Sequence, residues 1–577
     1  MAWQTAAIYA VFFLSGAAAL TYEISWSRQI GLLFGNTASA AATVLASYFV
    51  GLALGYALAG RVAQRLRRPL FAYGMMELLA AGWALLVPLL LSLLEEGQLA
   101  SLLHGMSPAM RTSARALLCV ALFLPATTAL GATLPLMVRW IGTADSGSGA
   151  RIAWAYGLNT FGGLVGVLLA TIVLLSHLGV VASSYAAAGA SVLCGIVAMV
   201  ASGRSGTSIV REVAAVRSAR SSDQRSEKYG LPKLTVLVAV SGFLTLALEV
   251  LYTRLFALTF HNSTYTFGLV VAVVLFGLAA GAWAAAWLHR YENAGLLAGW
   301  AFLLAGGAIS ISMLLFLNQT GLSYFRGGNT FAHYMTASVG LVAVVVFPPA
   351  LLLGVVLPLL WNAATTSHQA TSRIVGRLTA VNTLAAAAGA LAASFLMLPV
   401  LGLWSSFAVV AGVCIFASAW LLASQRSVAY GAATIAMACL TIAAWYVTTS
   451  QTAVPKHKSL VSRVEGSYGW IDVLKDNRSG ALSLRENINY THGSTASATW
   501  ERRQSHIPLL LHPAPRDVLY LGSGTGATAG GALMHEEIES IVIAELIPEV
   551  VDAARQFETS NLGVMEDPRT EIHIDDA

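Results

Sequence analysis

Long apolar segments separated by short polar loops dominate the first 454 residues. A helix needs about 20 apolar residues to cross the hydrocarbon core of a membrane. Thirteen segments qualify, at residues 5–27, 37–60, 70–94, 114–138, 152–176, 179–202, 234–256, 263–288, 294–317, 335–361, 374–400, 403–424 and 427–448. The pattern predicts a polytopic α-helical membrane domain, and its longest polar break lies at 203–233.

The two halves of this region repeat a set of small and polar residues. Those with a counterpart 226 positions later are Ser15, Gly16, Glu23, Arg28, Asn36, Gly51 and Gly55, and those with a counterpart 223 positions later are Pro125, Gly131, Pro135, Asn159, Thr160, Gly166 and Gly179. This conserved order predicts an internal duplication. Each copy has six segments, so we expect both copies in the same orientation, as in the parallel repeats of some transporters.

The repeated pairs Glu23/Arg28 and Glu249/Arg254 allow two interpretations. An ionisable residue within a membrane span is costly and suggests a functional site. Alternatively, each pair lies near a span end, where the arginine extends to the lipid headgroups and the glutamate pairs with it.

Two other repeated features predict helix packing. Asn159 and Asn382 are expected to form hydrogen bonds between helices rather than to bind a ligand. Gly51 and Gly55, with their counterparts in the second half, are typical of faces where helix backbones approach closely.

The distribution of charge divides the chain in two. Residues 1–454 hold 22 Lys/Arg and 10 Asp/Glu, so about 7% are charged, whereas residues 455–577 hold 11 and 18, or about 24%. Soluble proteins average about 25%, which excludes an ordinary soluble enzyme and predicts a membrane protein with a water-soluble tail. The basic excess belongs to membrane loops, so the lipid bilayer is the expected partner and nucleic acid is not.

Loop charges predict the orientation in a multi-pass cell membrane protein, such as one of the bacterial inner membrane. With the N-terminus in the cytoplasm, the cytoplasmic loops hold 17 Lys/Arg and the opposite loops 5. Thirteen crossings then place the tail outside the cytoplasm, unless one of the closely spaced segments 403–424 and 427–448 does not cross. The side of the tail stays open between these alternatives.

The tail shows two patterns in succession. Alternating residues at 467–474 and 481–484, separated by turn residues, predict a β-hairpin region. Short apolar strands are then expected at 517–521, 540–544 and 571–574, with helix-compatible segments between them. The expected units are repeat 1 (1–202), a basic cytoplasmic linker (203–233), repeat 2 (234–424), an additional span (425–454), the hairpin region (455–516) and a partial α/β domain (517–577).

Candidate binding residues follow the strands of this α/β segment. Gly522, Gly524 and Gly526 permit a sharp turn after the first strand and close approach of the backbone to a nucleoside. Glu545, 23 residues after Gly522, ends the second strand and can accept hydrogen bonds from ribose hydroxyls. A carboxylate after the third strand can reach the adenine amino group.

Four segments carry a resemblance to a known family: residues 506–513, 518–527, 544–551 and 567–569. They resemble the spermidine synthase (polyamine aminopropyltransferase) family, and the whole chain resembles its membrane-fused, spermidine synthase-like proteins. The resemblance implies a methyltransferase-like (Rossmann-like) α/β fold. It also implies transfer of an aminopropyl group from decarboxylated S-adenosylmethionine, the co-substrate, to a polyamine such as putrescine, without a metal.

The same resemblance assigns roles to individual residues. It implies that the three glycines of the loop line the donor, that Glu545 holds its ribose and that Asp576 faces its adenine. The chain departs from the family at three places. Thr525 stands in the glycine loop where the family has an aspartate that holds the donor's ammonium group, Ile547 replaces another aspartate, and residues 500–502 replace a Tyr-His-Glu segment.

The strands expected to carry the family's catalytic acid would follow the third strand, so we expect a truncated domain, interpret the chain as a fragment and assign no catalytic residue. Two alternatives remain. One is a transporter or membrane-binding module with a regulatory, nucleoside-binding tail. The other is an S-adenosylmethionine methyltransferase, which the threonine at 525 favours because that donor carries a carboxylate.

Overall fold

The structure is a computed structural model that describes residues 2–34, 38–96, 108–142, 148–204, 230–260, 264–289, 293–365, 371–423, 427–466 and 468–576. Asn36, its counterpart Asn262 and most of the basic linker lie outside the described residues, so the predictions made for them stay untested.

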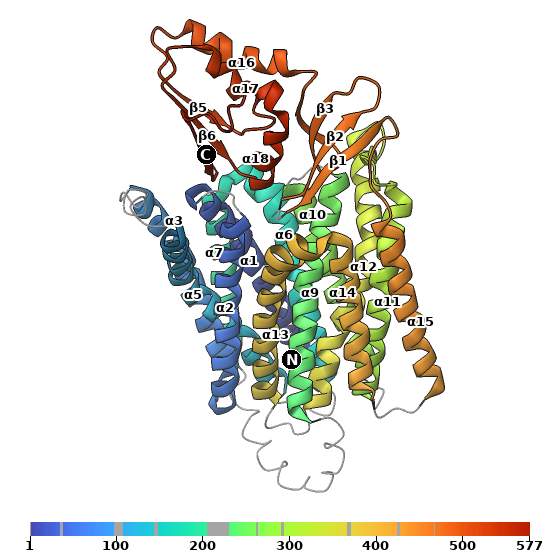
Figure 1. Ribbon diagram of the computed structural model, residues 1–577. Helices are drawn as coiled ribbons and strands as arrows, with labels where there is room; N and C mark the ends of the chain where they lie inside the picture. Colours follow the sequence, from blue (N-terminus) through green and yellow to red (C-terminus); the bar gives the residue numbers. More distant parts are fainter. Residues whose placement is uncertain are drawn as a thin grey trace.

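Two sets of long helices form a bundle (Figure 1). The first set is α1 (Ala2–Phe34), α2 (Ala38–Val62), α3 (Pro69–Glu96), α5 (Pro108–Ile141), α6 (Ser148–Leu168) and α7 (Leu175–Arg204). The second set is α9 (Leu231–Thr259), α10 (Thr264–Leu288), α11 (Ala294–Thr320), α12 (Phe331–Ala364), α13 (Thr371–Ala392) and α14 (Leu398–Leu421), followed by α15 (Val428–Thr449). Within the described residues, eleven helical stretches are long and apolar enough to cross a membrane, which is typical of a multi-pass membrane protein.

Two of these stretches each contain two predicted segments. They have 55 and 51 residues, and at about 1.5 Å per residue a straight helix of that length would far exceed a membrane core of about 30 Å. Each is interrupted at a glycine, Gly179 in the first and Gly402 in the second, where φ is 76°. Gly179 lies within α7, and both α6 and α7 pack on α1. Over the described residues, each of the thirteen predicted segments thus overlaps one of the eleven stretches.

The repeated asparagines make the same contact in both halves. Asn159 donates a hydrogen bond from Nδ2 to the carbonyl oxygen of Phe12 at 2.8 Å, and Asn382 donates one to Val238 at 3.0 Å. Phe12 and Val238 are themselves 226 positions apart. The prediction that these asparagines join neighbouring helices is confirmed.

The repeated glycines lie where helix backbones nearly touch. A Cβ atom on Gly55 would lie 2.1 Å from the carbonyl oxygen of Thr128, and one on Gly281 would lie 2.3 Å from that of Leu351. Both distances are far shorter than a van der Waals contact, so only glycine allows this approach. The prediction of a close packing face at Gly55 is confirmed, and the second half packs in the same manner.

The two sets of helices meet through α2 against α13 and α6 against α10. The last helix, α15, packs on α11 and α14 at the edge of the bundle (Figure 1), and most of its surface is exposed. α14 and α15 are both long enough to cross a membrane. Figure 1 shows that the tail lies at one end of the bundle, whereas α7 ends and α9 begins at the other.

The tail begins with an antiparallel sheet of four strands, two more than the predicted hairpin. The strands are β1 (Lys458–Glu465), β2 (Trp470–Asp476), β3 (Leu482–Glu486) and β4 (Tyr490–Ser494), paired in the order β1-β2-β3-β4. The turn between β2 and β3 forms because Asp476 Oδ1 accepts hydrogen bonds from the backbone N–H groups of Arg478 and Ser479. Helix α16 (Ala498–Leu511) follows β4.

A second, parallel sheet has the order β5-β6-β7, with β5 (Asp517–Leu521), β6 (Ser540–Glu545) and β7 (Thr570–Ile574). Short helices connect the strands, with α17 (Ala527–Gly530) after β5 and α18 (Pro548–Ala554) and α19 (Glu558–Asn561) after β6. Buried Ile541 and Ile543 of β6 pack in the core of this unit. Because the strands are parallel, the ends of β5, β6 and β7 meet at one edge of the sheet.

The tail contacts the bundle through two helices of the second half. Arg254 of α9 is 8% exposed and donates hydrogen bonds to the backbone carbonyl groups of Tyr468 and Gly466. The backbone N–H of Leu403, directly after the break in α14, donates to Oε1 of Glu465 at 2.7 Å. Arg254 thus faces the tail, and the interpretation in which it extends to lipid headgroups is wrong.

A buried ion cluster holds the first sheet to the segment that leaves α15. Asp472 is fully buried and accepts hydrogen bonds from Arg463 and Arg485, each at 2.6 Å. The same two guanidinium groups donate to the carbonyl oxygens of Thr452 and Ala453. The sheet and the connecting segment therefore share one charged centre.

Candidate functional site

The loop after β5 adopts a conformation that requires glycine. The φ angles of Gly522, Gly524 and Gly526 are 89°, 50° and 78°. These values lie in the left-handed region, which residues with a Cβ atom rarely adopt. The backbone N–H of Gly522 also donates to the carbonyl oxygen of Ala544 at 2.7 Å, which fixes the loop against the end of β6.

Glu545, at the end of β6, lies directly beside this loop. Its side chain is 6% exposed, and its Oε2 accepts hydrogen bonds from the backbone N–H of Ser523 at 2.8 Å and from the Ser523 hydroxyl at 3.0 Å. Oε1 accepts from the backbone N–H of Ile547 at 3.0 Å. The structure thus brings the predicted acid and the predicted loop together.

Thr525, the residue of the loop that departs from the family pattern, has an acidic partner that the sequence analysis missed. Its hydroxyl donates to Oε2 of Glu501 in α16 at 2.9 Å. Oε1 of Glu501 accepts from the hydroxyl of Ser497 at 2.5 Å and from the backbone N–H of Ser494 at 3.2 Å. A carboxylate therefore stands next to position 525, supplied by another element.

Asn561 of α19, a second residue that the sequence analysis missed, forms a hydrogen bond to the glycine loop. It is 1% exposed and donates from Nδ2 to the carbonyl oxygens of Thr525 at 3.0 Å and Ala554 at 2.9 Å. Its backbone lies so close to Gly530 that a Cβ atom there would be 2.2 Å from its carbonyl oxygen. The glycine loop is therefore fixed at both ends before any ligand binds.

The acids after β7 lie at the same edge of the sheet. The backbone N–H of Asp575 donates to the carbonyl oxygen of Glu545 at 3.2 Å, which joins the ends of β6 and β7. Asp576 follows with an exposed side chain. The predicted adenine-facing acid is thus next in the chain to a residue bonded to Glu545, whereas Thr525 and the glycines lie at the end of β5.

Other polar groups around the loop come from β4 and α16. The carbonyl oxygen of His492 lies within 3.3 Å of where a Cβ atom on Gly524 would be. His506 and His535 interact through their ring nitrogens at 2.9 Å, and partial burial together with His535 and Arg502 lowers the pKa of His506. Among the described residues, no group of three or more His, Cys, Asp or Glu side chains could hold a metal ion.

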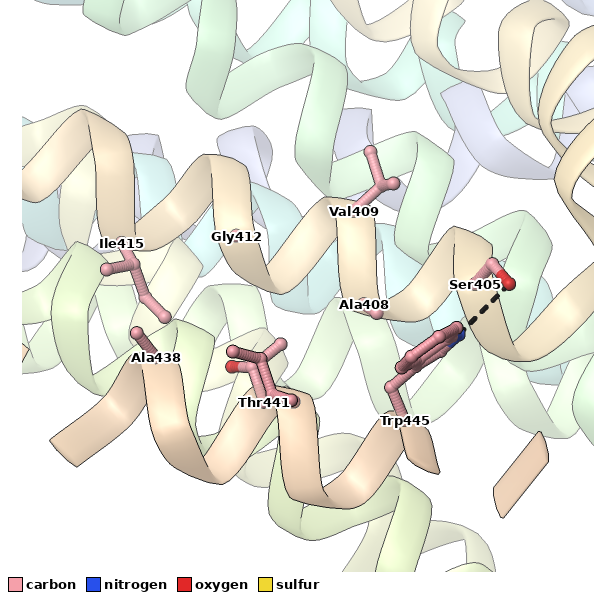
Figure 2. A pocket seen from close by; sticks show the side chains of 9 residues that line it. Ser405, Ala408, Val409, Gly412, Ile415, Ala438, Thr441 and Trp445 are labelled. Carbon is pink, nitrogen blue, oxygen red and sulfur yellow. Dashed lines mark hydrogen bonds between the residues drawn. The ribbon is translucent and has the colours of Figure 1, made fainter. Parts of the chain in front are cut away.

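Hollows of the surface lie away from this edge. One of about 430 Å³ lies between α14 and α15, and apolar side chains line most of it (Figure 2). Figure 2 shows Trp445 reaching across it, and its Nε1 donates to the Ser405 hydroxyl at 3.1 Å. A smaller hollow of about 190 Å³ lies at the junction of bundle and tail, beside Arg463, Glu465 and Trp470.

The C-terminal segment is similar to proteins of one known family. The sequence model described as "Spermine/spermidine synthase domain" matches residues 500–577. A curated relative from Leptospira biflexa, named polyamine aminopropyltransferase, is 35% identical over 139 residues, which are 23% of this chain and 48% of the relative. The chain spans from 22% to 48% of the length of such curated relatives.

Two solved structures are also similar. A spermidine synthase in complex with the transition state analogue AdoDATO is 26% identical and aligns with 20% of this chain and 41% of its own, at a TM-score of 0.19. The human organic anion transporter MFSD10 (TETRAN) is 15% identical and aligns with 72% of this chain and 99% of its own, at a TM-score of 0.46.

Proposed function

We propose that the protein is a membrane-bound aminopropyltransferase of the spermidine synthase type, whose tail binds an adenosine-containing sulfonium donor. The observation that carries the proposal is the edge of the parallel sheet, where the glycine loop meets Glu545. In a nucleoside complex, the glycines of the loop allow the ligand to approach the backbone closely. Glu545 then accepts hydrogen bonds from the ribose hydroxyls. Asp576 approaches the adenine from the next strand.

Glu501 favours decarboxylated S-adenosylmethionine over S-adenosylmethionine as the donor. The two donors differ at the end of the aminopropyl chain, where the first carries only an ammonium group and the second also a carboxylate. The Thr525 hydroxyl already donates to Glu501, so a negative charge stands where the family places its aspartate. An ammonium group is attracted to this charge, and a carboxylate is repelled by it.

The chemistry that follows needs positioning more than activation. The sulfonium carbon is already electrophilic, so the protein must align a neutral amine with it and accept a proton from that amine. A polyamine such as putrescine is the proposed acceptor.

Binding of the two donors to the full-length protein, measured by isothermal titration calorimetry, tests the proposal. We expect decarboxylated S-adenosylmethionine to bind more tightly than S-adenosylmethionine, and Glu501→Gln to remove most of this difference. Replacing an exposed acid, as in Glu537→Gln, is the control and should leave both affinities unchanged. Preference for the carboxylated donor would favour a methyltransferase, and absence of binding by either donor would refute the enzyme assignment.

A role in transport is a second candidate, because the bundle holds two acids at matched positions. Glu249 of α9 lies near enough to Glu23 of α1 to be affected by its charge. Two neighbouring carboxylates suit an organic polycation such as a polyamine. Uptake of radiolabelled putrescine into proteoliposomes tests this function, with Glu249→Gln as the variant expected to reduce it. Uptake equal to that of empty vesicles would dismiss the role for this substrate.

The duplicated halves and the orientation belong to the same proposal. The matched contacts of the asparagines and glycines support an internal parallel duplication of six helices each. The tail lies at the opposite end of the bundle from the ends of α7 and α9 that the basic linker 203–233 joins. Because cytoplasmic loops carry an excess of Lys and Arg, we infer that the tail lies on the face away from the cytoplasm. A reporter enzyme fused at residue 455, active on only one side of the membrane, tests this orientation.

A further inference from the structure

A glutamate without a basic partner is buried inside the first half of the bundle. Glu77 lies in the middle of α3 and is fully buried. The hydroxyl of Ser15, in α1, donates a hydrogen bond to its Oε1. Among the described residues, no Lys, Arg or His side chain pairs with this carboxyl group. An ionised carboxylate in such surroundings is strongly unfavourable unless a positive charge compensates it.

The carboxyl group of Glu77 also has hydroxyl groups of other residues as neighbours. Tyr73, one turn earlier in α3, and Ser191 of α7 lie beside the carboxyl group, and Tyr22 of α1 interacts with it electrostatically. The three hydroxyl oxygens and Glu77 Oε2 are all buried without a hydrogen-bond partner. Cys194 of α7 is the other titratable group close to Glu77. Hydroxyl groups, each with its own hydrogen, thus surround one buried acid, and no positive charge among the described residues balances it.

We propose that Glu77 is a proton-binding site within the membrane. A proton on Oε2 removes the uncompensated charge and turns that oxygen into a donor for the hydroxyl of Tyr73 or Ser191. One bound proton therefore removes the charge, and the neighbouring hydroxyl groups can accept from the protonated carboxyl group as readily as they donate to the carboxylate. The corresponding helix of the second half, α11, is the third helix of its set, as α3 is of the first, and it contains no Asp or Glu. A helix at this place in the fold therefore does not need an acid.

A row of buried polar side chains on one face of α1 gives the proton a path. Ser15, Tyr22, Ser25 and Gln29 lie within an arc of about 80° on this helix, at 100° per residue. The hydroxyl of Ser25 and both amide atoms of Gln29 are buried without a hydrogen-bond partner. From Ser15, which bonds to Glu77, these residues run along the sequence toward the C-terminal end of α1. Figure 1 shows that this end of α1 lies on the tail side of the bundle. The proton of Glu77 therefore exchanges with that side.

Infrared spectroscopy of the full-length protein in lipid tests the site. At neutral pH we expect the carbonyl stretch of a protonated carboxyl group, shifted in heavy water, and its loss in Glu77→Gln. The control Glu537→Gln removes an exposed carboxylate and should leave the band in place. Because Glu77→Gln could impair folding, Ser15→Ala provides a second readout, a shift of the band through loss of one hydrogen bond. A spectrum in which neither variant alters the band refutes the proposal.

A metal cation in place of the proton gives a different result. In that case sodium, compared with a bulky organic cation, raises the melting temperature of the unmodified protein but not that of Glu77→Gln, and this outcome overturns the proposal. The path is tested by the rate at which the band shifts in heavy water. Gln29→Leu should slow it several-fold, whereas Gln4→Leu, at the other end of α1, should not. Slowing by the second variant alone, or by neither, refutes the path.

Discussion

Replacing Glu545 by glutamine tests whether the end of β6 holds a nucleoside. The carboxylate is buried and accepts three hydrogen bonds, two from Ser523 and one from Ile547. The amide nitrogen of glutamine cannot accept a hydrogen bond, so at least one of these bonds is lost. The negative charge that we propose contacts the ribose is lost as well. The change in volume is negligible, so the effect reports on charge and hydrogen bonding.

The size of the effect follows from the lost contact. A hydrogen bond to an ionised group contributes about 1.5–3 kcal/mol, and about 1.4 kcal/mol corresponds to a tenfold change in affinity. We therefore expect Glu545→Gln to weaken nucleoside binding roughly 10- to 100-fold. Loss of a bond to the loop should also lower the melting temperature of the unliganded tail.

Calorimetry with 5′-methylthioadenosine is the most direct assay. This nucleoside is what remains when the aminopropyl group leaves the donor, and it has no ammonium group. Glu545→Gln should weaken its binding, whereas Glu501→Gln should weaken only binding of the intact donor. Equal affinities of the unmodified protein and Glu545→Gln for 5′-methylthioadenosine would show that the carboxylate does not contact the ribose.

Three further predictions concern the attachment of the tail. Asp472→Asn leaves the buried guanidinium group of Arg485 and the partly buried one of Arg463 without their anion. It should cost about 3–5 kcal/mol, seen as faster hydrogen exchange in β2, whereas the exposed control Asp552→Asn should change stability by less than about 0.5 kcal/mol. Gly402→Ala places a Cβ atom 2.8 Å from Glu465 Oε2 at a φ of 76°, so it should lower the melting temperature, whereas Gly412→Ala, with open space around it, should not. Burial raises the pKa of Glu465 in the folded protein. The protonated side chain therefore stabilises the folded state below the usual carboxyl pKa, and this stabilisation is lost as the pH rises through the raised pKa. Glu465→Gln should flatten the dependence of stability on pH in this range, and an unaltered dependence contradicts the prediction.

The sequence predicted the membrane part well because spanning a bilayer leaves a strong, local signal. Over the described residues, each of the thirteen apolar segments coincides with a long helix, and the repeated asparagines form the predicted hydrogen bonds. Two breaks in long helices fall at Gly179 and Gly402, which are also matched positions. Their positive φ angles are accessible mainly to glycine, so the residue type carries the information.

The tail was less predictable because its contacts join residues far apart in the chain. The glycine loop and Glu545 were found because both follow strands. Glu501 was missed because it reaches Thr525 across 24 positions from a helix that the sequence pattern did not indicate. Neither interpretation of Arg254 anticipated its contact with the tail, since its partners lie more than 200 positions further on.

The attachment of the tail to two separate helices has a mechanical consequence. Arg254 holds the β1–β2 turn to α9, and the N–H group of Leu403 holds the end of β1 to α14. Glu549 of α18, the helix that follows Glu545, lies against the same turn at Gly466. A change in the spacing of α9 and α14 would therefore strain the turn and displace α18. We therefore expect a change in the lateral pressure of the bilayer to alter binding at the proposed nucleoside site.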